Sequence, residues 1–413
     1  MAIALLGTLD TKGLEVAFLR ERLVELGRAA LVVDVGLFDP QGIVPDVGRE
    51  AVMSAAGAKP VALLRRPRSE IMAAMGRGAG ALLRTLEAEG RLEGVLGVGG
   101  NQGTSIVCTA MRQLPLGLPR LVVSTVASGN MRPYVGSSDI AVMFSVADLL
   151  GGPNAVVEPV LRNAAAAMAG MVTAAAARAP ACRDAGLVAV TALGNTHPAV
   201  TRIMEVLRSR GLHVAAFHAS GAGGSAMERL VSEGRVAAVL DLTPHELTEE
   251  VVGAGWYQPV ERGRCTSAGA AGIPQVIAPG SMEYLVFGPR DSLPPSFRRR
   301  RTFLHNPTCV HVPASRREMA AVGTALARRL NRSTGPVAVV LPLKGWSVYG
   351  GPGGPLHDAR ARAMFVEALT RALRKEIPVH RLPLHINEPA FADHCCAVLL
   401  EMLEARAARA QAG

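Results

Sequence analysis

Residues 2–13 read Ala-Ile-Ala-Leu-Leu-Gly-Thr-Leu-Asp-Thr-Lys-Gly, an apolar run that passes directly into a polar turn bounded by glycines. The run is short and bounded by turn signals, which predicts a buried strand over 2–6. Apolar residues then recur at helical spacing over 11–26, and Gly27 follows as a stop signal. A second apolar run over 30–35 predicts the next strand. This order of strand, turn, helix and strand is typical of a parallel α/β sheet.

The same order of elements returns in the second half of the chain. Gly211 aligns with Gly27, and the strand, turn, helix and strand around it superpose without a gap. The pattern therefore predicts an internally duplicated α/β protein of two Rossmann-like, doubly wound parallel-sheet domains, each of three αβα layers. The predicted domains are 1–182 and 183–413, with a boundary near 178–184 where Pro180 interrupts an Ala-rich helix. The remaining predicted elements are strands over 95–98, 121–123, 187–191, 213–217, 236–240 and 275–278, and helices over 81–89, 198–210 and 391–410.

Composition excludes several classes of protein. Hydrophobic residues make up 49% and charged residues 19% of the 413 residues, which is a globular balance, and no apolar run is long enough to span a bilayer. Six cysteines occur without a Cys-x-x-Cys pair, and no leader pattern is visible, so we expect a cytoplasmic protein. The net charge of +10 comes mostly from scattered arginines, and the one dense run, 298–301, lacks interleaved aromatic residues. We therefore expect neither a nucleic-acid nor a membrane partner.

Ligands of doubly wound sheets bind beyond the carboxyl ends of the strands, so the turns after the strands are where a site is expected. Three turns in the first half combine glycines with hydroxyl and amide side chains, and the first also carries a lysine at a helix start, which suits phosphate. Asp34 ends a strand where this class of fold commonly contacts a ribose. The alternative for each turn is a capping role alone. The predicted nucleotide-binding residues are Gly7, Thr8, Asp10, Thr11, Lys12, Asp34, Gly99, Gly100, Asn101, Gly103, Thr104, Ser124, Thr125 and Ser128.

The second half carries histidines and carboxylates beside glycines. The loop over 218–228 resembles a phosphate-binding loop, and we expect the groups around it to bind a substrate and move protons. The alternative for each histidine is that it lies in a turn and only makes hydrogen bonds there. The predicted catalytic residues are His218, Glu246 and His385, and the predicted substrate-binding residues are Ser220, Gly221, Gly223, Gly224, Thr243, His305 and Asn306. No metal-binding histidine spacing occurs, but Asp10 and Asp139 are candidate Mg²⁺ ligands beside a nucleotide.

These motifs together resemble one family. The turns over 7–13, 99–104, 124–129 and 134–136, and the segments over 217–228, 305–307 and 385–387, are similar in type and order to the ATP-binding domain family typified by the N-terminal region of a plant tomato-mosaic-virus resistance protein. The resemblance covers nearly the whole chain. It implies two Rossmann-like domains, ATP as the ligand of the first domain, and a homodimer. Two positions depart from the pattern: Glu388 stands where Asp is expected and Ser220 where Thr is expected.

The sequence leaves two functions open. The first is an ATP- and Mg²⁺-dependent enzyme, a ligase, kinase or hydrolase, acting on a small organic acid in a cleft between the two domains. The second is a non-catalytic dimeric module that binds ATP and regulates or sequesters a partner. A dehydrogenase is a third reading, but no Gly-x-Gly-x-x-Gly follows the first strand.

Overall fold

The computed structural model describes residues 1–177 and 186–412. The chain forms two compact units, Met1–Ala179 and Pro180–Gly413. The predicted boundary near 178–184 lies outside the described residues, as does Cys182. Among the described residues, no helix is both long and apolar enough to cross a membrane.

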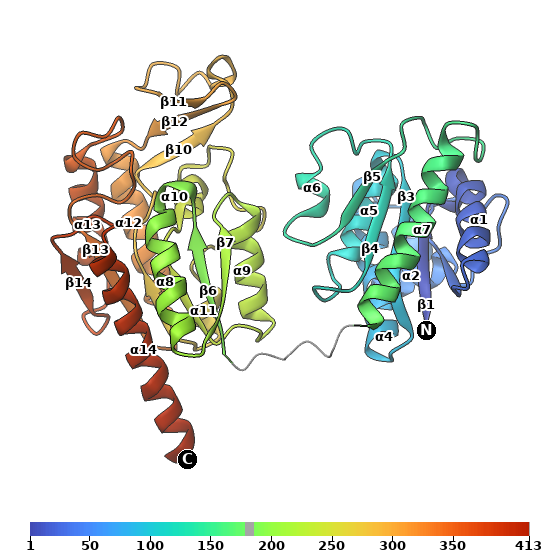
Figure 1. Ribbon diagram of the computed structural model, residues 1–413. Helices are drawn as coiled ribbons and strands as arrows, with labels where there is room; N and C mark the ends of the chain where they lie inside the picture. Colours follow the sequence, from blue (N-terminus) through green and yellow to red (C-terminus); the bar gives the residue numbers. More distant parts are fainter. Residues whose placement is uncertain (178–185, 413) are drawn as a thin grey trace. The chain divides into compact units, whose positions relative to one another are not determined.

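The N-terminal unit is built on a five-stranded, all-parallel sheet in the order β2-β1-β3-β4-β5 (Figure 1). Its elements are β1 (Ala2–Gly7), α1 (Leu9–Glu25), β2 (Ala30–Asp34), α2 (Arg49–Ala55), α3 (Pro60–Leu63), α4 (Arg68–Ala88), β3 (Leu92–Gly99), α5 (Asn101–Met111), β4 (Arg120–Ser124), α6 (Arg132–Val135), β5 (Ala141–Phe144) and α7 (Val157–Ala176).

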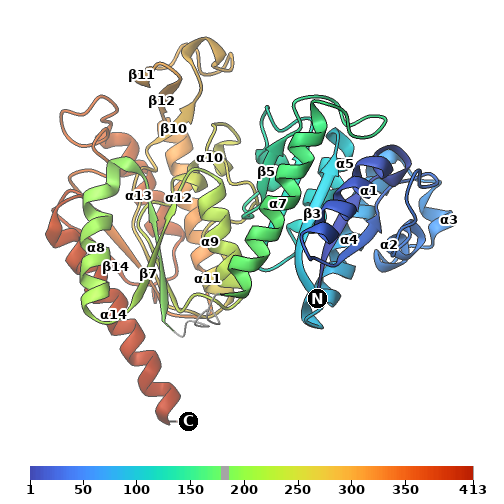
Figure 2. The ribbon, with the colours of Figure 1, turned by 45° about the vertical axis from the view of Figure 1, so that its right-hand side comes forward.

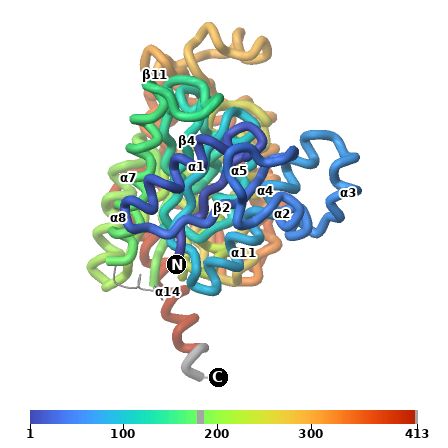
Figure 3. The backbone as a smooth tube through the Cα atoms, turned by 90° about the vertical axis from the view of Figure 1, so that its right-hand side faces the viewer, coloured from blue at the N-terminus to red at the C-terminus, as the bar shows by residue number. Residues whose placement is uncertain are grey.

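Both faces of this sheet are covered, because its strands are apolar on both sides. Side chains of α1 and α7 pack with one set of strand residues, including Leu5 and Val98. Side chains of α2, α4 and α5 pack with the other set, including Leu6 and Val95. Figure 3 shows α3 at the outer end of this unit, with α2 between it and the edge strand β2.

The C-terminal unit repeats this order with one strand more. Its six parallel strands run β14-β13-β9-β8-β6-β7, and α8 and α14 cover one face (Figure 2). The parallel strands and their helices are β6 (Leu187–Ala192), α8 (His197–Ser209), β7 (His213–His218), α9 (Ala222–Ser232), β8 (Ala238–Asp241), α10 (His245–Val252), α11 (Ser267–Ala270), β9 (Gln275–Ile277), α12 (Arg316–Leu330), β13 (Val337–Pro342), α13 (Ala359–Ala372), β14 (Val379–Leu382) and α14 (Pro389–Ala412).

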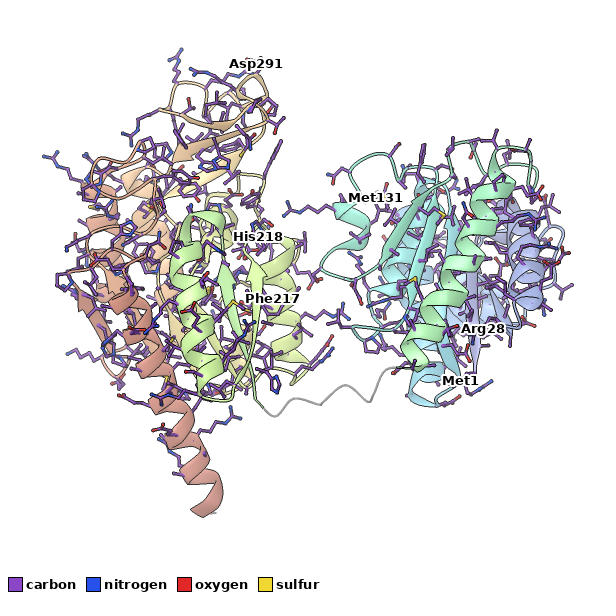
Figure 4. The ribbon with its side chains drawn as sticks, in the orientation of Figure 1. Met1, Arg28, Met131, Phe217, His218 and Asp291 are labelled. Carbon is purple, nitrogen blue, oxygen red and sulfur yellow. The ribbon has the colours of Figure 1, made fainter. Side chains whose placement is uncertain are left out.

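A small antiparallel sheet is inserted between β9 and α12. Its strands are β10 (Tyr284–Phe287), β11 (Phe303–Asn306) and β12 (Cys309–Pro313), in the order β10-β12-β11. Figure 4 places Asp291 at the tip of the loop that joins β10 to β11. The sequence pattern did not predict this insertion.

The predicted fold class is confirmed: both units are parallel α/β sheets with the same strand order around β1 and β6. In each unit the order reverses beside the first strand, between β1 and β3 and between β6 and β8. After the two strands of each pair, the chain turns to opposite faces of the sheet. This divergence leaves a crevice at the carboxyl edge. These two switch points are the positions at which a site is expected.

Candidate functional site

A pocket of about 410 Å³ lies at the switch point of the N-terminal unit. The turns after β1 and β3 both line it, and the sequence analysis predicted that the site would lie at these turns. Eight predicted residues form part of its wall: Thr8, Asp10, Thr11, Lys12, Gly100, Asn101, Gly103 and Thr125.

Two helices begin at this pocket, and neither N-cap residue caps its helix with its own side chain, although Asp34 Oδ1 accepts from the backbone N–H of Leu9 at the start of α1. Thr8 is the N-cap of α1 and Gly100 the N-cap of α5, and neither makes a side-chain capping hydrogen bond. The first backbone N–H groups of a helix have no partner within the helix, and the helix dipole makes that end attractive to anions. The pocket therefore offers donors to an anion from two directions.

Lys12 adds a positive charge, although its ammonium group is already engaged. Its side chain is nearly buried, donates to the carbonyl oxygen of Leu149 and lies 4.0 Å from the carboxylate of Asp148. The helix is locally distorted at this residue, where φ is −126° and ψ is 16°. Asp148 also lines the pocket and is largely exposed.

Asp10 shapes the pocket from its own turn. Its Oδ2 accepts hydrogen bonds from the backbone N–H groups of Leu37 and Phe38, both at 3.1 Å. This contact brings the segment after β2 over the pocket. The predicted metal pair does not form, since Asp139 precedes β5 at the opposite edge of the sheet and pairs there with the buried guanidinium of Arg120. Among the described residues, no group of three or more His, Cys, Asp or Glu side chains is arranged to hold a metal ion.

The other predicted nucleotide-binding residues lie beneath the pocket or beside it. Asp34 is buried, and its Oδ1 accepts from the backbone N–H groups of Leu9 at 3.2 Å and Gly36 at 2.8 Å. Burial raises the pKa of this carboxyl group above its usual value, against the opposing effect of those two hydrogen bonds. Asp34 thus positions the turns and does not line the pocket.

The hydroxyl groups of Thr104 and Ser124 play a similar supporting part. They are fully buried and lie 2.6 Å apart, which ties the start of α5 to the end of β4. Gly7 and Gly99 allow close packing, because a Cβ at either position would overlap a neighbour. Ser128 is exposed and does not line the pocket.

Apart from Gln102, which lies in a predicted turn, six lining residues were not predicted from the sequence: Leu37, Phe38, Arg68, Met72, Ile106 and Asp148. Four of them are apolar and give the pocket an apolar wall. Arg68 adds a guanidinium group that donates to Gln102 Oε1 at 2.7 Å. The pocket is therefore polar on one side and apolar on the other.

In the C-terminal unit, the predicted phosphate loop is already filled by a carboxylate of the chain itself. Glu246 Oε1 accepts from the backbone N–H groups of Gly221 at 2.6 Å and Gly224 at 3.0 Å. Its Oε2 accepts from Nε of the buried Arg264 at 2.5 Å. A Cβ at Gly224 would overlap this carboxylate. The structure therefore gives Glu246, Gly221 and Gly224 a structural role in place of the predicted catalytic and substrate-binding ones.

Arg264 is the centre of this buried network. Besides Glu246 it pairs with Glu228 at 2.8 Å and with Asp241 at 3.0 Å. Thr191 Oγ1 donates to Asp241 Oδ1 at 2.6 Å, and the backbone N–H of Thr243 donates to Thr191 Oγ1. Thr243 is fully buried, so the predicted substrate contact at this residue is replaced by packing across the β6–β8 switch point.

The histidines of this unit fall into different settings. His218 is exposed at the end of β7, beside Phe217 (Figure 4), and its Nδ1 lies 2.8 Å from Ser220 Oγ. His385 Nε2 donates to the carbonyl of Ser347 at 3.1 Å, while its Nδ1 accepts from the backbone N–H of Asn387. Both ring nitrogens of His385 thus hold loops together.

His305 lies on β11, stacked 4.8 Å from His311, and Asn306 Oδ1 accepts from the backbone N–H of Thr308 in the next turn. Both residues are exposed. A Cβ at Gly223 would overlap the backbone of His218, so this glycine serves loop packing.

The fold and this pocket define a two-unit parallel α/β protein with an anion-attracting crevice at the N-terminal switch point. The chain belongs to the family described as "Uncharacterised protein family (UPF0261)", whose N-terminal domain matches residues 1–177 and whose C-terminal domain matches residues 185–403. A UPF0261 protein of Clostridium tetani is 34% identical over 405 residues, covering 97% of this chain and 99% of its own length. A second, of Mesorhizobium japonicum, is 37% identical over 399 residues, covering 96% and 98%.

The relationship to the plant protein is also shown. The ToMV resistance protein Tm-1(GCR237) of Solanum lycopersicum is 34% identical over 339 residues, which is 80% of this chain and 44% of the tomato protein. The chain therefore spans less than half of that relative. Among solved structures, the glycosyltransferase SnogD of Streptomyces nogalater covers 97% of this chain at 13% identity and a TM-score of 0.19, a likeness that carries no argument.

Proposed function

We propose that the N-terminal unit binds ATP with Mg²⁺ in the switch-point pocket. The observation that carries the proposal is the convergence of two helix N-termini, those of α1 and α5, on one pocket with Lys12 beside them. Backbone donors in this arrangement suit the phosphates of a nucleotide, as in other doubly wound sheets.

The apolar wall supports a nucleotide over a free phosphate. Phe38, Met72 and Ile106 line the same pocket as the turn that Gly100 begins. A purine base buries its faces against apolar side chains, while its phosphates need the polar end. A volume of about 410 Å³ lies within the roughly 300–1,000 Å³ typical of ligand pockets.

Asp10 and Asp148 supply carboxylate oxygens on the polar side of the pocket. Mg²⁺ is usually held by one or two carboxylates together with phosphate oxygens and waters. Asp10 and Asp148 would hold the metal, which would neutralise phosphate charge, and Asp148 takes the place that the sequence analysis gave to Asp139.

ATP bound in this pocket serves one of two functions. The first is an ATP-dependent reaction on a small organic acid. The second is a dimeric binding module without turnover. The pocket wall favours the second in one respect: the only acidic or basic side chains among its lining residues are Asp10, Lys12, Arg68 and Asp148, so general-base catalysis rests on carboxylates alone.

Calorimetric titration of the full chain with ATP, ADP and NAD, with and without Mg²⁺, tests the binding. We expect ATP to bind more tightly than ADP, and Mg²⁺ to strengthen ATP binding. Binding of NAD without binding of ATP would reject the proposal. Release of inorganic phosphate, measured with the same protein and a panel of organic acids, separates an enzyme from a module.

A further inference from the structure

A second group of functional side chains gathers in the C-terminal unit, away from the filled glycine loop. Tyr284, His311 and His305 form a stacked column, with ring centroids 4.7 Å apart in the first pair and 4.8 Å in the second. His245 continues the column 4.9 Å from Tyr284, and the Tyr349 ring lies 5.1 Å from His311. Tyr257 also joins this cluster, 5.7 Å from His245, so three of the chain's four tyrosines lie here.

The loops at the carboxyl edge of the sheet are bonded to each other around this column. Asn195, after β6, donates to Tyr284 Oη at 2.5 Å and accepts from Ser281 Oγ at 2.7 Å. Ser347, after β13, donates to Glu283 Oε1 at 2.5 Å. Asn387, after β14, donates to the carbonyl of Asn195 at 2.9 Å.

Three polar atoms of this network lack a partner. They are Glu283 Oε2, His311 Nδ1 and Asn387 Oδ1, and each is buried. The Glu283 and His311 side chains are each only 5% exposed. An unpaired buried carboxyl oxygen costs free energy. Its presence therefore indicates a functional role or a bound partner for that oxygen.

Burial shifts the pKa values of two of these groups toward their neutral forms. Burial raises the pKa of Glu283 above its usual value, against the hydrogen bond from Ser347. Burial, together with the charges of His305 and His245, lowers the pKa of His311 to about 3.

A glycine-rich loop covers the carboxyl group. Residues 345–354 read Gly-Trp-Ser-Val-Tyr-Gly-Gly-Pro-Gly-Gly. A Cβ at Gly350 would overlap Glu283 Oε1, so the backbone lies directly on this side chain. Entry of a ligand requires this loop to lift. That movement breaks the hydrogen bonds that the carbonyl oxygens of Ser347 and Gly350 accept from His385 and Arg362.

We propose that Glu283 is the central carboxyl group of a second ligand site, which binds a small polyhydroxylated compound, a polyol or a monosaccharide, beneath the 345–354 loop. The unpaired oxygens are acceptors, so the ligand must supply hydrogen-bond donors, which hydroxyl groups do. The ring column offers a face for the C–H side of such a ligand. The proposal concerns the C-terminal unit alone and does not depend on ATP binding.

Calorimetric titration of the full chain with glycerol, D-ribose, D-glucose and myo-inositol tests the ligand class. We expect at least one compound to bind, and Glu283→Gln to weaken it at least tenfold while ATP affinity stays unchanged. Tyr349→Ala, which removes only a half-exposed ring, weakens the same ligand, and Glu401→Gln on the exposed face of α14 does not. Failure of all four compounds to bind, or equal binding by Glu283→Gln, would overturn the proposal.

A stability measurement tests the carboxyl group without any ligand. Because the folded-state pKa of Glu283 is raised, the unfolded chain ionises first, and the contribution of Glu283 to stability falls as pH rises above about 4.5. Glu283→Gln keeps the shape of the neutral acid, so we expect its melting temperature at pH 8 to exceed that of the natural chain by about 2–4 °C. A lower melting temperature for this variant from pH 5 to pH 8 would show a purely structural carboxyl group and contradict the proposal.

Discussion

The carboxylate of Glu246 accepts a hydrogen bond of 2.6 Å from the backbone N–H of Gly221, and with Gly224 it fills the loop that most resembled a phosphate site. Successive backbone N–H groups of a glycine turn make a concave site for an anion. Here the chain supplies the anion itself. The glycine-rich turns at the two switch points therefore differ: the turn at Gly100 faces an open pocket, and the turn at Gly221 is occupied.

The filled loop predicts that Glu246 serves stability. Glu246→Ala leaves Arg264 with one carboxylate fewer and two backbone N–H groups unpaired in a fully buried site. Breaking a buried ion pair from one side costs about 3–5 kcal/mol. We expect the free energy of unfolding of the C-terminal unit to fall by about that amount in urea.

The exposed pair Arg202–Asp393 provides the matched control for that variant. Both side chains are more than two-fifths exposed, at 44% and 43%. Exposed ion pairs contribute about 0–1 kcal/mol, so Asp393→Ala should change the same free energy little. Equal losses of unfolding free energy in the two variants would show that Glu246 contributes no more to stability than an exposed ion pair does.

A methyl group at Gly103 is predicted to abolish ATP binding without unfolding the protein. The nearest atoms to such a Cβ are Val98 O at 3.6 Å and Thr8 Oγ1 at 3.7 Å, so alanine fits the fold. The methyl group would nevertheless stand in the pocket, at the start of α5, where backbone must approach phosphate. We expect the ATP dissociation constant to rise at least about tenfold, which is about 1.4 kcal/mol, as measured by calorimetry.

Gly170→Ala on α7 controls for the glycine-to-alanine change itself. No atom lies within 4 Å of its Cβ, and the helix gains up to about 1 kcal/mol. ATP affinity should remain as in the natural chain. Retention of ATP binding by Gly103→Ala would remove the turn after β3 from the nucleotide site.

Asp34→Asn distinguishes support of the pocket from contact with a ribose. Asparagine keeps an Oδ1 that accepts from the backbone N–H groups of Leu9 and Gly36. We expect ATP affinity within about threefold of the natural value, or roughly 0.7 kcal/mol. A loss of tenfold or more would restore the ribose contact that the sequence alone suggested.

The stability of the C-terminal unit should depend on the protonation of His245. Burial lowers the pKa of this imidazole, but the hydrogen bond and charge of Glu249, 3.2 Å away, outweigh burial and raise the pKa above 6.5. The contribution is present below pH 6.5 and is lost as pH rises through the folded-state pKa, because the unfolded chain gives up the proton first.

Urea unfolding between pH 5 and pH 9 measures this dependence. In Glu249→Gln the imidazole loses its charged partner, so the decline above pH 6.5 should flatten and the pKa of His245, followed by NMR, should fall. An unaltered pH profile in this variant would assign the decline to another group.

The sequence predicted the arrangement of strands well because buried parallel strands are short, continuous apolar runs that turn residues interrupt. The predicted strand over 2–6 is β1, and the one over 187–191 is β6. It predicted most of the pocket's polar wall for the same reason: Thr8 and Gly100 directly follow strands, and topology brings strand ends together.

Arg68 and Met72 were missed because the sequence predicted this helix only over 81–89, whereas α4 begins at Arg68. Gly76, Gly78 and Gly80 lower helix propensity, so the sequence pattern appears to stop at them. In the structure a Cβ at Gly78 would overlap Val52 O, and one at Gly80 would overlap the Gln113 side chain. These glycines permit close helix packing, and the first turns of α4 then carry Arg68 and Met72 to the pocket.

The filled loop was also beyond sequence pattern. Glu246 lies 22 residues beyond Gly224, and only the β7–β6–β8 arrangement brings its carboxylate to the loop. A glycine-rich turn has the same sequence pattern whether it binds a phosphate or a carboxylate of its own chain.

A crystal structure of the full chain with Mg-ATP tests the central claim most directly. The account predicts phosphates at the backbone N–H groups of Asn101, Gln102 and Gly103, the base against Phe38 and Met72, and the loop at Gly221 unchanged. Phosphates bound at Gly221 and Gly224 with Glu246 displaced, or an N-terminal pocket left empty at saturating ATP, would contradict it.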